Sequence, residues 1–295
     1  MKRRRVVQSI ALAPLMMSAA GFKSRKREDT PKRIQYSVNA YSFNQQLRSG
    51  AMDFFDMMEY AADIGLDAVD LTGYYFSSYP KPPEDQILFK HKKKALELGL
   101  DIPWTGIRND FANPDAEKRR EDRQLIREWL AVSSKLGATI MRVFAGTSDH
   151  DGYSREQVKE WMVEDFKICS QYAAENGVIL GLQHHNDFLY TANEIIEIMQ
   201  RVNSEWFGLI LDTGSLHAQD PYEEMKILAP YANYWFVKEH IYPGGQKTEV
   251  DMSKVAQVVK AQGYQGYISF ESLSDGDPKV IVKNLLDRFR EAYEE

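Results

Sequence analysis

Residues 207–215 read Phe-Gly-Leu-Ile-Leu-Asp-Thr-Gly-Ser, a short apolar run that ends in the carboxylate of Asp212 and a turn. An uninterrupted apolar run of this length is typical of a parallel strand that is buried on both faces. Residues 267–271, Tyr-Ile-Ser-Phe-Glu, repeat the arrangement and end in Glu271. Because active sites of parallel barrels form at the carboxyl ends of the strands, we expect these two distant acids to meet at one site. Such a pair suits one divalent metal or one sugar.

The rest of the chain alternates similar apolar runs with longer amphipathic segments. Glycines such as Gly137 and Gly177 follow these segments, where a left-handed residue commonly ends a helix. The predicted strands are Ile34–Ala40, Ala68–Leu71, Ile102–Ile107, Thr139–Phe144, Val178–Gln183, Phe207–Asp212, Tyr234–Lys238 and Gly266–Glu271. The predicted helices are Asp53–Ile64, Glu84–Leu98, Asp115–Leu136, Ser154–Asn176, Ala192–Val202, Pro221–Leu228, Met252–Gln262 and Pro278–Tyr293.

This alternation predicts an α/β fold, a single-domain (β/α)8 TIM barrel over residues 34–295. The competing fold is a doubly wound open sheet, which usually carries a glycine-rich phosphate loop after its first strand. Here the first strand leads to Asn39-Ala40-Tyr41-Ser42-Phe43-Asn44, which contains no glycine.

The N-terminus differs from the barrel in composition. Lys2-Arg3-Arg4-Arg5 precedes a short apolar run that ends in small residues, which is the order of a signal peptide. We therefore expect a signal segment at 1–22, by the Sec or twin-arginine route, a polar linker at 23–33, and a periplasmic protein. The apolar run is short for a stable membrane span.

Composition narrows the class of partner. The net charge of -6 comes without a basic stripe, so nucleic acid is not an expected partner. Aromatic residues make up 12% of the chain, which is typical of sugar-handling proteins and also of many ordinary cores, and a small carbohydrate is the expected partner. Cys169 is the only cysteine of the 295 residues and lies in an amphipathic run, which predicts a buried thiol. A homo-oligomer is compatible with the sequence.

Polar and ionisable residues follow nearly every predicted strand. They would form one ring at the carboxyl edge of the barrel, suited to a polyhydroxylated ligand with or without a metal. The candidates for this ring are Asn39, Arg108, Asn109, Arg142, Gln183, His185, Asp212, His217, Lys238, Glu239, His240 and Glu271.

Each member also has a purely structural interpretation. Asp212 is a good turn or helix cap, since Asp-Thr-Gly favours turns. Arg142 lies inside an apolar strand, so it either pairs with a barrel acid or holds substrate. His184 and His185 would point to opposite faces of a strand, and the phase that exposes Gln183 selects His185.

The segments Arg108-Asn109-Asp110-Phe111, Arg142-Val143-Phe144-Ala145-Gly146, Leu211-Asp212-Thr213-Gly214 and Ile268-Ser269-Phe270-Glu271-Ser272 are together similar to segments of the xylose isomerase-like TIM-barrel family. This family comprises sugar (phosphate) isomerases and epimerases and is related to endonuclease IV. The resemblance covers nearly all of the chain after residue 33. It implies a divalent metal (Mn, Mg, Co or Zn) held after strands five to eight.

Two implied metal ligands differ in this chain. Asp212 and Glu271 match the family pattern, but Gln183 stands for a Glu and Phe236 for a His. The expected ligand set is therefore Gln183, Asp212 and Glu271, with His240, or else His217, substituting for the missing imidazole. A Gln side chain cannot accept a proton, so epimerisation by the family's pair of Glu bases is not expected in its usual form.

Three functions remain open at this point. The first is an isomerase or epimerase that abstracts a proton next to the carbonyl of a non-phosphorylated sugar at a metal, with Glu271, His185 and Lys238 as catalytic groups. The second is a lyase that uses the same first step to eliminate a β-substituent from a keto-sugar or 3-keto-glycoside. The third is a sugar-binding barrel without catalysis.

Overall fold

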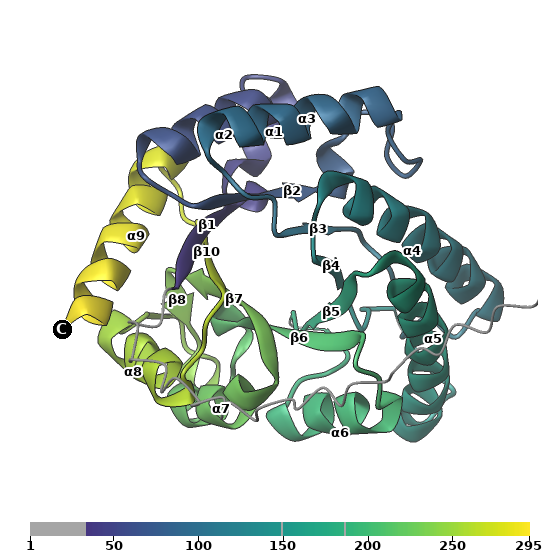
Figure 1. Cartoon of the computed structure of the whole chain (residues 1–295). Coiled ribbons are helices and arrows are strands. Elements are labelled where there is room, and N and C mark those ends of the chain that lie inside the picture. Colours follow the sequence, from purple (N-terminus) through teal and green to yellow (C-terminus); the bar gives the residue numbers. More distant parts are fainter. Residues whose placement is uncertain (1–33, 149, 186) are drawn as a thin grey trace, which may run out of the picture. The chain divides into compact units, whose positions relative to one another are not determined.

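The computed structural model describes residues 34–148, 150–185 and 187–295. Within these ranges, eight parallel strands close into a barrel in the order β1-β10-β7-β6-β5-β4-β3-β2. Helices form a ring around the strands (Figure 1). The barrel strands are β1 (Gln35–Asn39), β2 (Ala68–Thr72), β3 (Trp104–Gly106), β4 (Ile140–Val143), β5 (Ile179–Gln183), β6 (Phe207–Asp212), β7 (Ala232–Lys238) and β10 (Tyr267–Glu271).

The helices begin and end at residues whose chemistry favours those positions. Ser154 and Thr191 each cap a helix through a reciprocal capping box, and Gly137 ends a helix with φ of 87°. The α-helices are α1 (Asn44–Ser49), α2 (Phe54–Asp63), α3 (Asp85–Leu98), α4 (Ala116–Leu136), α5 (Arg155–Asn176), α6 (Ala192–Val202), α7 (Pro221–Leu228), α8 (Met252–Gln262) and α9 (Pro278–Glu294). Short 3-10 turns occupy Ala40–Phe43, Gly73–Tyr75, Thr213–Ser215, Ala229–Tyr231 and Pro243–Gly245.

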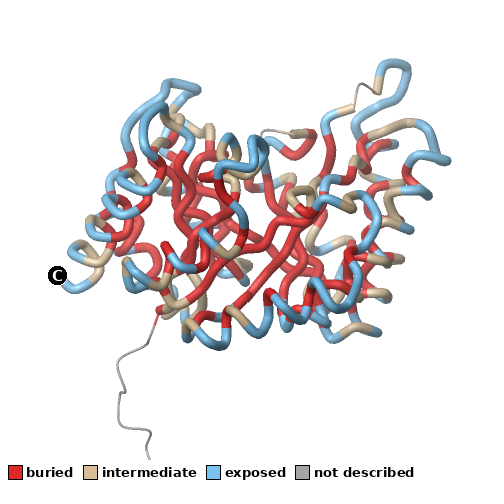
Figure 2. Tube along the Cα trace, turned by 90° about the horizontal axis from the view of Figure 1, so that it is seen from above, coloured by how far each residue is buried: buried red, intermediate tan, exposed pale blue. Residues whose placement is uncertain are grey.

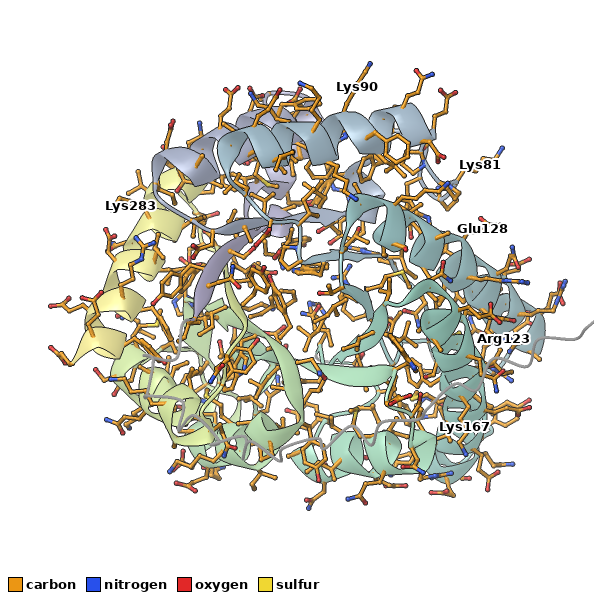
Figure 3. All side chains as sticks on the ribbon, in the orientation of Figure 1. Lys81, Lys90, Arg123, Glu128, Lys167 and Lys283 are labelled. Carbon is orange, nitrogen blue, oxygen red and sulfur yellow. The ribbon has the colours of Figure 1, made fainter. Side chains whose placement is uncertain are left out.

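Burial follows the two-layer design of this fold. The barrel strands are buried over most of their length, whereas the helices from α2 onward bury one side and expose the other (Figure 2). Charged helix residues such as Lys90, Lys167 and Lys283 point outward from the ring (Figure 3). The main apolar core therefore lies between the strands and the helices, as expected for parallel strands covered by amphipathic helices.

A second, smaller apolar cluster fills the barrel interior. It consists of Trp104, Ile140, Ile210, Tyr234 and Phe236, from the strands β3, β4, β6 and β7. The Trp104 and Phe236 rings lie 5.2 Å apart between centroids. Side chains two residues apart on a strand point the same way. On each of these strands, the residue two positions after the cluster member therefore also points into the barrel, but lies nearer its carboxyl end. This aromatic layer is the floor on which the polar site rests.

The strand register places three of the expected site residues directly above this aromatic layer, toward the carboxyl end of the barrel. Asp212 pairs with Phe236, and Glu271 pairs with Lys238. A register shift between Leu209 and Ile210 accompanies the pairing of β6 with β7. Residues Asp212, Lys238 and Glu271 therefore end three adjacent strands of the barrel.

The predicted (β/α)8 barrel is confirmed, and all eight predicted strands are present with ends shifted by at most a few residues. The closed sheet excludes the doubly wound alternative. The sequence did not predict α1 or the small antiparallel sheet of β8 (His240–Ile241) and β9 (Thr248–Glu249), because elements this short carry no hydrophobic period. Cys169 is buried, as expected.

The expected signal segment at 1–22 and the expected linker at 23–33 lie outside the described residues. In the part of the chain that is described, no helix combines the length and apolarity that crossing a membrane requires.

Candidate active site

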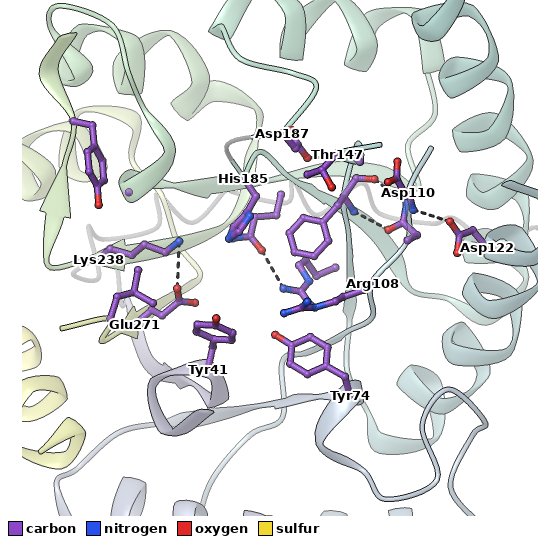
Figure 4. A pocket seen from close by; sticks show the side chains of 18 residues that line it. Tyr41, Tyr74, Arg108, Asp110, Asp122, Thr147, His185, Asp187, Lys238 and Glu271 are labelled. Atoms are coloured by element: carbon purple, nitrogen blue, oxygen red, sulfur yellow. Dashed lines mark hydrogen bonds and ion pairs between the residues drawn. The ribbon is translucent and has the colours of Figure 1, made fainter. Parts of the chain in front are cut away.

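A cavity of about 620 Å³ opens at the carboxyl ends of the barrel strands. Figure 4 shows Lys238 and Glu271 at one side of it, and Asp110 and Asp122 at the other. The lining residues are Tyr41, Tyr74, Arg108, Asn109, Asp110, Asp122, Arg142, Phe144, Gly146, Thr147, Gln183, His185, Asp187, Gly214, Lys238, Tyr242, Glu271 and Leu273. The cavity lies where active sites of this fold are found.

Lys238 forms the charged centre of the site. Its Nζ lies 2.7 Å from Asp212 Oδ2 and 3.2 Å from Glu271 Oε1. The side chains of all three are nearly inaccessible, with exposures of 5% for Lys238, 0% for Asp212 and 6% for Glu271. A buried charge is tolerated only when it is paired and hydrogen-bonded. The three groups therefore form one electrostatic unit.

Neutral amides complete the bonding of the two carboxylates. Gln183 Nε2 donates to Asp212 Oδ2 at 2.7 Å, and Asn39 Nδ2 donates to Glu271 Oε2 at 2.5 Å. Asn39 Oδ1 in turn accepts from the backbone N of Tyr41, which fixes the amide orientation. Asn39 and Asp212 themselves do not line the cavity, so they position Glu271 and Lys238 from behind.

The ionisation of the unit follows from these contacts. Burial disfavours the charged ammonium, but the carboxylates of Asp212 and Glu271 outweigh burial and raise the pKa of Lys238. Burial would also raise the pKa of Asp212, yet the charge of Lys238 lowers it. For Glu271, burial prevails over the attraction of Lys238, so its pKa is raised. A carboxylate with a raised pKa is suited to accept a proton.

Arg142 adds a second buried cation. Its Nη1 donates to Gln183 Oε1 at 3.4 Å and its Nη2 donates to the carbonyl of Ile107 at 3.2 Å. The guanidinium lies 4.2 Å from the Phe144 ring centroid, and its Nε has no partner among the described residues. Of the two interpretations left open by the sequence, these contacts favour substrate binding, since they include only an amide, a carbonyl and aromatic rings.

The two adjacent histidines point in different directions. His185 lines the cavity, 5.1 Å from the Phe144 ring. Burial and the charge of Lys238 lower the pKa of His185, which favours the neutral imidazole near pH 7. His184 is buried, and its Nε2 accepts a hydrogen bond from the backbone N of Asp212 at 3.0 Å. His185 is thus available to substrate, whereas His184 supports β6.

Some residues expected in the ring have other roles. Glu239 accepts hydrogen bonds from the backbone N of Leu273 at 2.7 Å and of Ser274 at 3.0 Å, so it holds the loop after β10. His217 stacks on Tyr190 at 5.0 Å. Asn109 lines the cavity but uses its amide to bind both backbone groups of Phe144. Arg108 lines the cavity and lies over the Tyr74 ring at 4.9 Å.

His240 is not where the sequence analysis placed it. It begins β8 and pairs with Glu249 of β9, outside the lining of the cavity. After Lys238 the chain leaves the barrel and turns into this small sheet, so the imidazole is carried away from Asp212 and Glu271. The prediction that His240 takes the place of the missing histidine is therefore wrong.

One wall of the cavity is aromatic, which was not predicted from the sequence. Tyr41, Tyr74, Phe144 and Tyr242 all line the cavity. Aromatic faces commonly pack against the apolar faces of ligands, and Tyr hydroxyls add hydrogen bonds. Phe144 ends a predicted strand and the three tyrosines follow predicted strands by one to four residues, which was the available signal.

The residues present do not fit a divalent metal. Phe236, at the position of the implied histidine, is fully buried in the aromatic floor and offers no donor atom. The Nζ of Lys238 contacts both Asp212 and Glu271, and the amide nitrogen of Gln183 faces Asp212. Among the described residues, no group of three or more His, Cys, Asp or Glu side chains is placed to hold a metal. The expected ligand set is therefore not assembled.

Solved structures of similar fold carry several activities. D-psicose 3-epimerase from Clostridium cellulolyticum H10 superposes with a TM-score of 0.74 at 15% identity, covering 88% of this chain and 99% of that one. The 3-keto-D-glucoside 4-epimerase of E. coli gives a TM-score of 0.71 at 14% identity, with coverages of 88% and 100%. A probable 3-DHS dehydratase of Bacillus anthracis gives 0.68 at 18%, with coverages of 86% and 98%. At these identities the likeness shows the fold alone.

No curated protein sequence matches the chain. The profile of one family does match, over residues 58–292, which span most of the barrel. Together with the closed barrel, this match identifies the chain as a member of the xylose isomerase-like TIM-barrel family.

Proposed function

We propose that the protein is a sugar isomerase or epimerase-type enzyme that abstracts a proton from the carbon next to a carbonyl. The observation that carries the proposal is the buried Glu271 carboxyl, which lines the cavity beside the ammonium of Lys238. A base of raised pKa next to a fixed positive charge is the pair of groups that enolisation requires.

The chemistry follows from the placement of the groups. Glu271 takes the proton from carbon, and the electron pair of the broken C–H bond moves to the carbonyl oxygen. Lys238 and Arg142 both line the cavity and supply positive charge for that oxygen. The apolar rings of Phe144 and Tyr74 border the same space and lower its polarity, which strengthens these interactions.

Return of the proton decides the product. Isomerisation needs delivery to the neighbouring carbon, and epimerisation needs delivery to the opposite face of the same carbon. His185 is a second proton carrier that lines the cavity. Gln183 lines the cavity where the family resemblance implies a Glu, and an amide cannot carry a proton. His185 is therefore the partner of Glu271 in this proposal.

Solvent exchange tests the first step. Keto-sugars without phosphate are incubated with the protein in D2O, and deuterium at carbon is followed by mass spectrometry. Glu271→Gln is expected to lower the exchange rate by about 100- to 10,000-fold. Glu128→Gln, on the exposed side of α4, is the matched control and should exchange at the wild-type rate. Exchange that survives in Glu271→Gln would remove the proposed base.

A lyase is the second candidate. The specific observation is that Glu271 lines the cavity as a carboxylate base, whereas Gln183 stands where the family resemblance implies the second Glu. Elimination needs only one base and one acid. A 3-keto-glycoside in the same assay would then release its substituent, and an unsaturated keto-sugar would accumulate. Tight sugar binding without exchange or release would instead support the non-catalytic barrel.

The choice of non-phosphorylated sugars rests on the expected export of the chain, since sugar phosphates are scarce outside the cytoplasm. Export itself is a proposal from the signal-like N-terminus. Fractionation of cells that produce the full chain tests it: a mature protein beginning near residue 22 in the periplasm supports export.

A further inference from the structure

Lys238 is held by three consecutive residues, of which the first ends β6 and the next two follow it. Asp212 receives its Nζ at 2.7 Å, and Thr213 Oγ1 accepts from its backbone N at 3.0 Å. Gly214 makes room for the stem, because a Cβ there would lie 2.4 Å from Cδ of Lys238. Contacts shorter than 3.0 Å require something to move, so this position favours glycine although its φ is ordinary. The turn therefore binds the ammonium of Lys238, hydrogen-bonds its backbone, and leaves space for the methylene groups of its side chain.

The oxygens that a metal would need are already engaged. Asp212 Oδ2 accepts from Lys238 and from Gln183 Nε2, and its Oδ1 accepts from the backbone N of Gly214 at 3.0 Å. Glu271 Oε1 faces Lys238 at 3.2 Å, and its Oε2 accepts from Asn39. Each carboxylate oxygen in the unit therefore has a hydrogen-bond donor from the protein itself.

The side of the site where an imidazole is implied is also filled. Phe236 stands in register with Asp212, and its ring packs 5.2 Å from Trp104 and 5.7 Å from Tyr234. Lys238 lies two residues further along β7 and so points the same way. The positive side chain of Lys238 thus lies between Asp212 and Glu271, on the carboxyl side of the aromatic layer.

We propose that the ammonium of Lys238 takes the place of the divalent cation, so that this chain catalyses carbanion chemistry without a metal. The inference rests on the proposed function for its catalytic part. An ammonium has three N–H donors. Two of them face Asp212 and Glu271, and the third is left for a substrate oxygen, since Lys238 lines the cavity.

The step balances without a cofactor. Glu271 forms an O–H bond as the substrate C–H bond breaks, and the electron pair becomes an enediolate whose oxygen accepts a hydrogen bond from Lys238. The ammonium keeps all its protons throughout. When Glu271 returns its proton to carbon, the carbonyl and the starting charges of Lys238 and Glu271 are restored. When His185 delivers the proton instead, Glu271 loses its proton to water and His185 takes one up before the next turnover.

The first experiment measures deuterium exchange after exhaustive dialysis against EDTA, with metal content determined on the same sample. The expected rate equals that of the undialysed protein within about twofold, and added Mn²⁺, Mg²⁺, Co²⁺ or Zn²⁺ leaves it unchanged. A rate that falls tenfold or more with EDTA and recovers with one of these metals would overturn the inference and leave the proposed function standing.

The second experiment replaces the ammonium. Lys238→Ala should lose about 100- to 1,000-fold in exchange, the usual effect of removing one oxyanion donor. Ethylammonium added to the folded variant should restore part of the rate, whereas a merely structural lysine would give no such rescue. Lys135→Ala, which breaks an exposed pair with Asp85, is the matched control and should retain the wild-type rate.

Metal binding gives a readout that does not need a substrate. Mn²⁺ alone is titrated into wild type and Lys238→Ala and followed by electron paramagnetic resonance. Removal of the ammonium leaves two adjacent carboxylates, so the variant is expected to bind Mn²⁺ at least tenfold more tightly than wild type. Wild-type binding that is equal to or tighter than that of the variant would overturn the inference even if no sugar is turned over.

Discussion

Two buried carboxyl groups in the same barrel face opposite electrostatic surroundings. Asp70, on β2 at the level of the aromatic floor, accepts hydrogen bonds from three hydroxyl groups: Ser37 Oγ at 2.8 Å, Tyr234 OH at 2.9 Å and Ser269 Oγ at 2.5 Å. Asp212, at the carboxyl edge, has the ammonium of Lys238 at 2.7 Å. Both carboxyl groups are fully buried, with exposures of 0%.

The difference in partner reverses the effect of burial. Burial raises the pKa of Asp70 to about 7, since hydroxyl donors only partly offset it. The charge of Lys238 overcomes the same burial at Asp212 and lowers the pKa of that group. One barrel thus holds an acid that ionises reluctantly, which ties strands together, and one that stays ionised, which orients a cation. Four substitutions test this contrast, and they are ordered here by expected effect.

Removal of the cation should have the largest effect on stability. Lys238→Met leaves Asp212 and Glu271 buried without a counter-charge, and breaking such a unit costs about 3–5 kcal/mol. Lys135→Met breaks a pair whose members are 45% and 53% exposed, so it should cost less than about 1 kcal/mol. Urea unfolding at pH 7 measures both. Equal losses in the two variants would contradict the picture of a buried ionic unit.

Asp70→Asn should change how stability depends on pH. The folded pKa of Asp70 is raised to about 7 from 3.8, so wild type loses stability as pH rises from about 4 to 7, and the neutral amide does not. Each pKa unit corresponds to about 1.4 kcal/mol, so the variant should gain up to about 4 kcal/mol relative to wild type across that interval.

The readout is the difference in unfolding free energy between Asp70→Asn and wild type at pH 4 and pH 8. Other acids of raised pKa, including Asp122 and Asp187, are present in both proteins and cancel in the difference. Tyr234, which faces Asp70, stays neutral over this range because burial raises its pKa. A difference that does not vary with pH would show that Asp70 ionises normally.

Gly214→Ala should displace the lysine without removing its charge. The added methyl group would meet Cδ of Lys238 at 2.4 Å, and overpacking of this kind costs about 1–3 kcal/mol. Deuterium exchange should fall together with stability. Gly152→Ala adds a methyl group where nothing lies within 4 Å, but at φ of 87°, so it reports backbone strain alone and should leave the exchange rate unchanged.

Glu239→Gln should have the smallest effect. The amide keeps an acceptor for Leu273 and Ser274 but loses the charge, which costs about 1 kcal/mol. Since Leu273 borders the cavity, KM should rise a few-fold while kcat changes little. A selective fall in kcat would indicate that Glu239 takes part in proton transfer.

The fold could be predicted because its signals are local. Each strand is a short apolar run, and helix ends are marked by residues such as Ser154, Thr191 and Gly177, whose capping chemistry is independent of the rest of the chain. The ends of parallel strands then gather at one edge, which is why the sequence could place Asp212, Lys238 and Glu271 on the same rim.

The detailed site could not be predicted in the same way. The position of His240 depends on where the chain leaves the barrel. The β8–β9 sheet that holds it away from the site has strands of only two residues each, which is too short to leave a pattern in the sequence. The contact of Lys238 with two acids depends on the path cleared by Gly214, a neighbour that is distant in sequence. Glu239, by contrast, follows Lys238 directly, so strand alternation could have assigned it to the opposite face.

The aromatic floor of Trp104, Tyr234 and Phe236 has a kinetic consequence. Because these rings fill the barrel below Lys238, substrate and product must pass through the same opening, and one cannot arrive until the other has left. Turnover is then expected to be slowed by accumulated product in direct competition with substrate.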